Sequence, residues 1–148
     1  MKLFLLSIAI IFASGVETFG QEFTKDDGNL DLPFDSVDVQ ILKRANNILL
    51  SESAWSKEDD RKCQDDIDSN KYSLFCALYK ASIDVVGEYD HRKPALQQVR
   101  WSIDNHYKER LAGHRLMDFN NHSNTNFDEI KQLLQESILI AQQKIKKE

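Results

Sequence analysis

Glycine and proline are scarce in this sequence, which has five glycines and two prolines among 148 residues. A β-sandwich needs such residues at its many turns, so their scarcity argues against that fold. Basic residues are also outnumbered, with 19 Lys and Arg against 24 Asp and Glu for a formal charge of −5, which argues against binding nucleic acid by charge. The apolar share of 41% is too high for a wholly disordered chain, and the length suits one domain.

The first twenty residues have the pattern of an export signal. After a basic residue comes the apolar run Leu3–Ala13, which reaches about 16 Å as a helix and cannot span the roughly 30 Å core of a bilayer. Thr18 and Gly20 are the small residues expected before a cut at Gln21. We therefore predict a signal peptide over residues 1–20 and a secreted or periplasmic protein with no membrane span after cleavage. The alternatives are an uncleaved anchor and an N-terminal core helix.

The chain has two cysteines, Cys63 and Cys76, which lie 13 positions apart. An even cysteine count in an exported protein favours a disulfide, and closing a loop of this size stabilises a fold by about 3 kcal/mol. Two free thiols or two ligands of a metal site are the alternatives, although no C-x-x-C or H-x₃-H pair accompanies them. We predict the disulfide, and no metal.

Apolar residues recur at spacings of three and four through most of the chain after residue 34, which predicts an all-α fold. Residues 21–34 lack this period and are expected to form an extended lead-in. The helical domain would then cover residues 35–148 as a single compact bundle of about four helices, with a long stapled loop between the first two. The predicted helices are residues 36–51, 72–86, 95–112 and 127–145.

Residues suited to helix ends mark the limits of these elements. Asp35 or Ser36 can cap the first helix, and Gly87 can end the second. Gly113 is expected to stop the third helix, and Thr125 to cap the last, with a carboxylate three positions further on.

Residues 52–71 are expected to form the long polar connection, because they carry few apolar residues and a run of charges. Trp55 is expected to plug the core beside this loop rather than to line a ligand groove. Trp101, on the third predicted helix, points away from its apolar face. It is therefore either a partner contact or a residue that the lead-in covers.

Four short stretches carry a family resemblance: Trp55, Cys76-Ala77-Leu78, Phe119-Asn120-Asn121 and Thr125–Leu134. They resemble an uncharacterised family of small bacterial all-helical domains of unknown function. Its pattern has a Trp after the first helix, a Cys-Ala-rich central helix, a Trp-Asn-Asp turn and a last helix capped by Thr-x-x-Glu. The likeness spans residues 38–145, and Phe119 and Asn121 replace the Trp and Asp of the turn. The resemblance implies a helical fold and adds no activity, because the family has none assigned.

The acidic loop between residues 57 and 70 lacks a complete metal motif. Asp66-x-Asp68-x-Asn70 has the opening spacing of a calcium loop, but Lys71 and Ala77 stand where an EF-hand needs Gly and Glu. A solvated charged loop is the preferred interpretation, and we predict no cofactor. A weak cation site would draw on the loop's carboxylates, Asp59, Asp60, Asp65 and Asp66.

A catalytic set is only faintly indicated between residues 114 and 120. His114 is expected to lie at the core edge as a hydrogen-bonded histidine, with a general base served by Asp118 as the alternative. Asn120 is the middle of the stretch 119–121, which is expected to be a turn between the last two helices. Asn121 also begins an N-glycosylation acceptor sequence, Asn-His-Ser.

These observations predict an exported small helical binding or interaction domain that is not an enzyme. Its partner would be a protein or small ligand outside the cytoplasm, met through the acidic loop or through the candidate binding residues Trp101, Trp55, His114 and Asn120. One alternative is a hydrolase-like or metal-dependent enzyme using His114, Asp118 and Asn120. Another is an effector or immunity protein in bacterial competition.

Overall fold

A computed structural model describes residues 33–146, which form six α-helices and no β-strand. The predicted all-α class is confirmed, although the helices are more numerous than the four expected. They are α1 (Ser36–Ile48), α2 (Cys63–Ser69), α3 (Leu74–Val86), α4 (Pro94–His106), α5 (Arg115–Asn121) and α6 (Phe127–Ile145). Two 3₁₀ turns, η1 (Glu52–Ala54) and η2 (Lys108–Arg110), complete the set. The predicted signal peptide and nearly all of the predicted lead-in lie outside the described residues.

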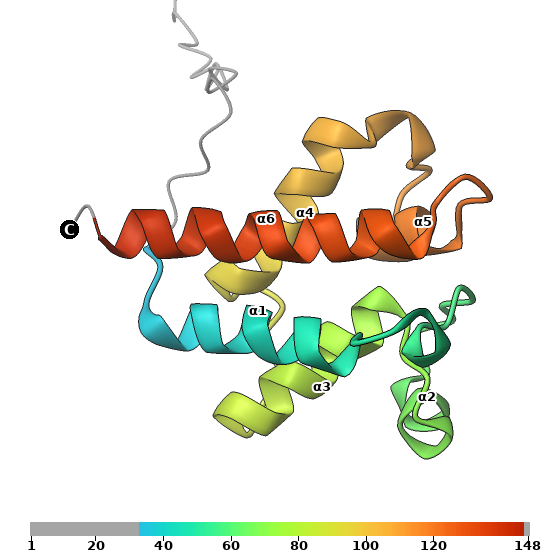
Figure 1. Ribbon diagram of the computed structural model, residues 1–148, viewed down its shortest axis with the longest axis horizontal. Coiled ribbons are helices and arrows are strands. Elements are labelled where there is room, and N and C mark those ends of the chain that lie inside the picture. Colours follow the sequence, from blue (N-terminus) through green and yellow to red (C-terminus); the bar gives the residue numbers. More distant parts are fainter. Residues whose placement is uncertain (1–32, 147–148) are drawn as a thin grey trace, which may run out of the picture.

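The helices pack around α1. In Figure 1, α6 runs antiparallel along one side of α1 and α3 crosses its other side, while α4 contacts both α1 and α6. Every long helix and α5 contribute wholly buried side chains, among them Leu42, Leu78, Leu96, Phe119 and Leu134. Burying a side chain of this size contributes about 1.5–3 kcal/mol to folding, so this shared core is the main source of stability.

The start of α1 is fixed by a capping box, and its N-cap is Asp35, one of the two residues predicted for that position. Asp35 accepts hydrogen bonds from the amides of Val37 and Asp38, and the Asp38 carboxylate accepts one from the Asp35 amide in return. The same buried Asp38 accepts from the amide of Ala95 at 3.0 Å, so it also joins the first turn of α1 to the first turn of α4.

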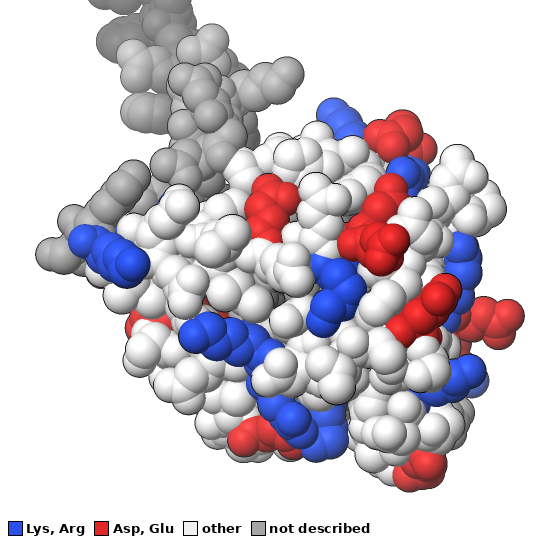
Figure 2. All heavy atoms as spheres, viewed as in Figure 1, with Lys and Arg blue, Asp and Glu red and all other residues white. Residues whose placement is uncertain are grey.

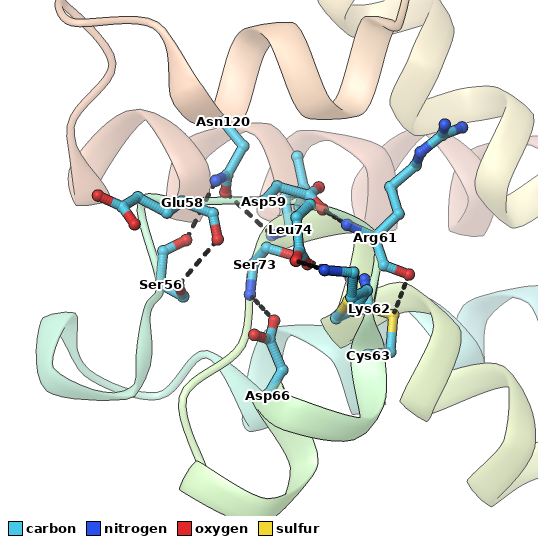
Figure 3. Close-up of a disulfide and its surroundings, with 12 residues drawn as sticks. Ser56, Glu58, Asp59, Arg61, Lys62, Cys63, Asp66, Ser73, Leu74 and Asn120 are labelled. Carbon is cyan, nitrogen blue, oxygen red and sulfur yellow. Dashed lines mark hydrogen bonds and ion pairs between the residues drawn. A yellow bond between two sulfur atoms is a disulfide. The ribbon is translucent and has the colours of Figure 1, made fainter.

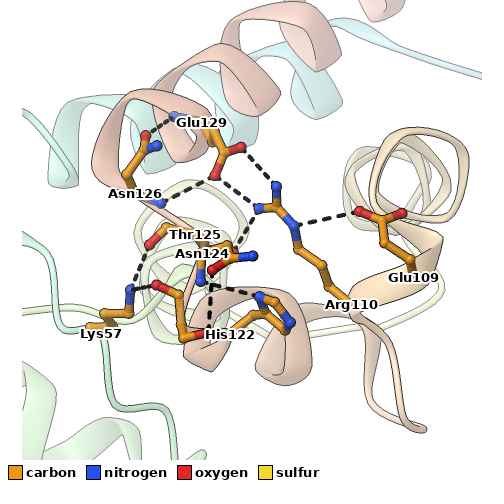
Figure 4. Close-up of polar contacts among 9 residues, drawn as sticks. Lys57, Glu109, Arg110, His122, Asn124, Thr125, Asn126 and Glu129 are labelled. Atoms are coloured by element: carbon orange, nitrogen blue, oxygen red, sulfur yellow. Dashed lines mark hydrogen bonds and ion pairs between the residues drawn. The ribbon is translucent and has the colours of Figure 1, made fainter.

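The last helix begins at Phe127, but its N-cap lies one residue later than predicted. Asn126 is the cap, paired reciprocally with Glu129, whereas Thr125 is buried. The Thr125 hydroxyl accepts from Arg110, whose guanidinium also makes a two-pronged bond to Glu129 at 2.9 and 3.0 Å (Figure 4). Lys57 adds bonds to the carbonyls before the helix. Side chains from elsewhere in the chain therefore decide which residue caps the helix.

The third predicted helix ends too late: α4 stops at His106, not beside Gly113. The Tyr107 ring packs on Phe119 at a centroid distance of 4.5 Å, with the Arg110 guanidinium 4.7 Å from the Tyr107 ring. The amides of residues 112–114 bond to the Asp118 carboxylate instead of to helical carbonyls. These contacts turn the chain away from the α4 axis and into α5.

The predicted long connection holds more structure than expected. It contains η1 and the short helix α2, which ends at Asn70 in the left-handed conformation. A single pair of backbone bonds closes its base, because the Tyr72 amide donates to Ala54 and the Ser56 amide donates to Tyr72. The segment is thus a closed loop of the fold rather than a free linker.

The surface mixes charges of both signs. On the face seen in Figure 2, Lys and Arg side chains and Asp and Glu side chains are interspersed over the body of the domain. Within residues 33–146, no helix has both the length and the apolar character that crossing a bilayer requires.

Candidate functional site

A groove of about 420 Å³ lies between α2 and α3. Most of its exposed lining is apolar, and it comes from one side of α2, the outer side of α3 and the loop after α3. The apolar lining residues are Ile67, Phe75, Tyr79, Ile83 and Tyr89. The volume lies within the usual range for small-molecule sites. A hollow of about 430 Å³ beside the end of α1 has a mostly polar lining, so its apolar lining makes the groove the better candidate for a small-molecule site.

Three half-buried aromatic rings form one wall of the groove. Phe75 and Tyr79 stand one helical turn apart on α3, with ring centroids 6.5 Å apart, and Tyr89 returns from the following loop to within 5.9 and 5.3 Å of them. The Tyr89 hydroxyl accepts from Arg100 at 3.4 Å, and Arg100 also donates to the carbonyl of His91. The wall is therefore held in place by contacts with α4 as well as by α3.

The predicted disulfide between Cys63 and Cys76 joins α2 to α3 beside the groove, with a Cα–Cα distance of 5.1 Å (Figure 3). Asp66 adds a polar tie, since its carboxylate accepts from the amide of Ser73 at 2.7 Å. A helix as short as α2 would be marginal alone in water. The disulfide and this bond together fix the separation between α2 and α3, and this separation sets the width of the groove.

Arg61 stands at one end of the groove in an unusual backbone conformation. Its φ is +63°, a left-handed value that an L-residue other than Gly, Asn or Asp seldom adopts. The Asp59 carboxylate holds it there by accepting from the Arg61 amide at 2.8 Å. In Figure 3 the guanidinium extends away from that carboxylate, and it makes no hydrogen bond or ion pair with any residue in the described range.

A second, smaller cavity of about 100 Å³ adjoins the groove and shares Arg61 and Phe75 with it. Its polar lining is basic, from Arg100, His114 and Arg115. The apolar groove and this basic cavity are thus neighbours that differ in the chemical character of their linings.

Asp59 is buried, with 5% of its surface exposed, below the loop that carries Arg61. Its Oδ2 makes no hydrogen bond of ordinary geometry to the described residues. Burial raises the pKa of Asp59, while the Arg61 amide and the Ser73 hydroxyl act in the opposite direction. The Asn121 side chain makes two hydrogen bonds to the Asp59 backbone: it accepts from the amide at 2.7 Å and donates to the carbonyl at 3.0 Å.

The stretch 119–121 is not the predicted turn but the last part of α5, and Asn120 is wholly buried. Its Oδ1 accepts from the Trp55 indole at 2.9 Å and from the Leu74 amide at 3.0 Å. Its Nδ2 donates to the carbonyls of Ser56 and Lys57. We call Asn120 with these four partners the Asn120 node.

Within the Asn120 node, the side chains of Asn120 and Trp55 have a structural role. Both hydrogens of the Asn120 amide and its oxygen are engaged within the fold. Trp55 is buried, as expected for a core plug, and lies 6.1 Å from Phe127 between ring centroids. Neither residue presents an atom to a ligand. The Asn121 amide nitrogen, which would carry a glycan, is likewise occupied by its bond to Asp59.

The structure does not place His114 at the core edge. Because α4 ends at His106, His114 lies in the following loop and is exposed. Asp118 does not serve it as a base partner, since one carboxylate oxygen accepts from three backbone amides, those of residues 112–114, at 2.8, 2.6 and 2.7 Å. Burial acts to raise the pKa of Asp118, but the three hydrogen bonds from these amides together hold it below its usual value. The geometry therefore gives no support to a His114–Asp118–Asn120 catalytic set.

The remaining candidates are scattered. Trp101 is half-buried on α4, and its role as a partner contact stays a prediction. In the acidic loop, Asp60 pairs with Lys62 at 3.1 Å and Asp66 bonds to Ser73. No group of three or more ligating side chains within the described residues is arranged to hold a metal ion. The Asp65 side chain lies outside what the structure describes.

The sequence analysis missed the groove because it placed the predicted helix of residues 72–86 in a compact bundle and left none of its apolar residues for a ligand. The available signal was that α3 is apolar nearly all round, whereas the bundle covers only part of a helix surface. Tyr89 and Arg61 carried no periodic signal at all, since both lie in loops. Their positions depend on α2, which was itself predicted to be irregular.

A comparison with known protein families finds a match, which includes the residues of the groove. The chain matches the model of a family of unknown function over residues 34–138. The chain belongs to the DUF6197 family. No curated protein and no solved structure matches it. The DUF6197 match includes α1 to α5 and most of α6, so the groove and the Asn120 node both lie within the family domain. The resemblance to an uncharacterised family is thus confirmed, and DUF6197 carries no assigned activity.

Proposed function

We propose that this protein is an exported, non-catalytic binding domain that holds the apolar part of a ligand in the groove between α2 and α3. The observation that carries the proposal is the aromatic wall of Phe75, Tyr79 and Tyr89, whose rings remain half-buried while facing a hollow of about 420 Å³. Aromatic rings offer a large contact area with little conformational entropy to lose, so a rigid wall of this kind favours binding.

Export is supported by two independent features. The run Leu3–Ala13 followed by small residues fits a cleaved signal, and the Cys63–Cys76 disulfide fits an oxidising compartment such as the periplasm or the extracellular space. Intact mass of protein recovered from that compartment should correspond to a chain that begins at Gln21. Recovery of the uncleaved chain from the cytosol would contradict this part of the proposal.

The groove is tested with 4-phenylbutanol, a neutral probe with an aromatic and an aliphatic part. Titration of the ¹⁵N-labelled, disulfide-bonded protein should shift amide signals of α2 and α3 at millimolar probe, as expected for a weak fragment-sized ligand. Ile83→Glu should abolish the shifts by placing a charge in the groove. Leu139→Glu is the matched control, because Leu139 is 57% exposed on α6 and outside the groove. Unchanged binding in the Ile83 variant, or no binding by the native protein, would overturn the proposal.

A further inference from the structure

The charged residues that line the groove are all basic, although the whole chain carries −5. The groove and the adjoining cavity are lined by the basic residues Arg61, Lys80, Arg100 and Arg115, and within the described residues no Asp or Glu lines either of them. Charged lining residues of one sign favour a ligand group of the opposite sign. This inference rests on the function proposed above, and it concerns the chemical class of the ligand.

Three of the four cations already have partners within the fold. Lys80 pairs with Asp84, and Arg115 pairs with Asp104 at 2.6 Å. The Arg100 guanidinium donates to the carbonyl of His91 and to the hydroxyl of Tyr89. Only the Arg61 guanidinium, within the described part of the chain, has five donors and no acceptor in reach.

We infer that the groove binds an apolar organic acid, with its hydrocarbon part against Phe75, Tyr79 and Tyr89 and its carboxylate on Arg61. A guanidinium presents a planar fork that matches the two oxygens of a carboxylate. One unpaired cation balances one negative charge, which fits a carboxylate better than a doubly charged phosphate ester. The volume of the groove, about 420 Å³, suits a small molecule rather than a long segment of a partner protein.

The backbone conformation at Arg61 allows the role of its side chain to be tested separately from the fold of the loop. Glycine would adopt the φ of +63° without steric cost, whereas arginine adopts it only because Asp59 and the surrounding loop impose it. Glycine at this position would therefore keep the loop and remove only the guanidinium. That property supplies a variant whose loss of binding cannot be attributed to misfolding.

The test compares 4-phenylbutyrate with the neutral 4-phenylbutanol by NMR titration. The native protein should bind the acid about tenfold more tightly than the alcohol, the gain expected from a charge-assisted pair, and this preference should weaken as salt is raised. Arg61→Gln and Arg61→Gly should both reduce acid binding to the level of the alcohol and leave alcohol binding unchanged. Lys62→Gln is the control, because Lys62 is the adjacent cation, is exposed, pairs with Asp60 and lies outside the groove lining.

The outcomes separate the two proposals. Equal binding of acid and alcohol by the native protein, or an acid preference that survives both Arg61 variants, would overturn the assignment of an organic acid and leave the groove as an apolar binding site. A loss of acid binding in Lys62→Gln equal to that in Arg61→Gln would also overturn it, since the effect would then be one of general charge. Failure of both probes to bind would overturn the proposed function as well.

Discussion

The Asn120 node and the groove both involve the loop between η1 and α2, but they differ in whether their polar side chains have hydrogen-bond partners within the fold. In the node, the Asn120 amide is wholly buried and bonds to two donors and to carbonyls of the loop. At the groove, the guanidinium of Arg61 makes no bond to the described residues. The difference shows where the domain uses polar groups to hold its fold and where it leaves them available to a ligand.

The largest effect is expected from Asn120→Ala, which breaks the node. The change leaves the Trp55 indole N–H, the Leu74 amide and two loop carbonyls without their partner, and each buried group left unpaired costs about 1–3 kcal/mol. Allowing for water that reaches the loop, we expect a loss of roughly 3–4 kcal/mol in the free energy of unfolding by urea. Asn124→Ala is the control, because Asn124 is an exposed asparagine in the turn after α5. Similar stability for both variants would show that the node holds nothing together.

A smaller loss is expected when the disulfide beside the groove is removed. Cys63→Ala combined with Cys76→Ala should lower the free energy of unfolding by about 3 kcal/mol or somewhat less, because the unfolded chain regains the freedom of a 13-residue separation. Reduction of the native protein should have the same effect in urea unfolding. The amides of α2 should also exchange faster with solvent. Unchanged exchange in α2 would mean that Asp66 and Ile67 suffice to hold it on α3.

The smallest effect is expected from Asp59→Asn, which probes the boundary between the two regions. Burial raises the folded-state pKa of Asp59 above its ordinary 3.8, so folding favours the protonated form. The stability linked to this group is complete below pH 3.8 and is lost as the pH rises through the raised value. The neutral variant should therefore be more stable than the native protein at pH 7, by up to about 1 kcal/mol.

The measurement for Asp59 is urea unfolding at a series of pH values. The advantage of the Asp59→Asn variant should shrink as the pH falls and vanish near pH 3.8. Asp60→Asn is a suitable control, because Asp60 is exposed and its pKa is lowered by bonds to Lys62. That variant should show the opposite trend. A pH-independent difference for Asp59→Asn would mean that the buried carboxylate is equally charged in the folded and unfolded states.

The sequence predicted those parts of the fold that depend on local chemistry. Asp35 caps α1, and Gly87 ends α3 with a φ of +86° that suits glycine. The early end of α4 could not be predicted, because Asp118 draws three amides away from the helix and Tyr107 packs on Phe119. These contacts exist only once α5 has formed.

The candidate site was harder to predict than the fold. Trp55, His114 and Asn120 were chosen as candidate binding residues for the type of side chain that they carry. The Asn120 side chain is wholly buried, so its polar atoms serve the core and do not reach a ligand. The groove residues were overlooked because apolar periodicity shows that a helix face avoids water, but not whether protein or ligand covers it. That distinction depends on which neighbours pack against α3, and α2 covers only part of it.

The meeting of α1 and α6 at one end of the bundle has a practical consequence. The Phe34 ring lies under Lys144, with 5.7 Å between its centroid and Nζ, so the start of the first helix and the finish of the last are neighbours (Figure 1). A short linker could join them, and the backbone could be reopened in the exposed turn at residues 123 and 124 to give a circular permutant. The same closeness would let the domain be spliced into a surface loop of a host protein as a ligand-responsive insert.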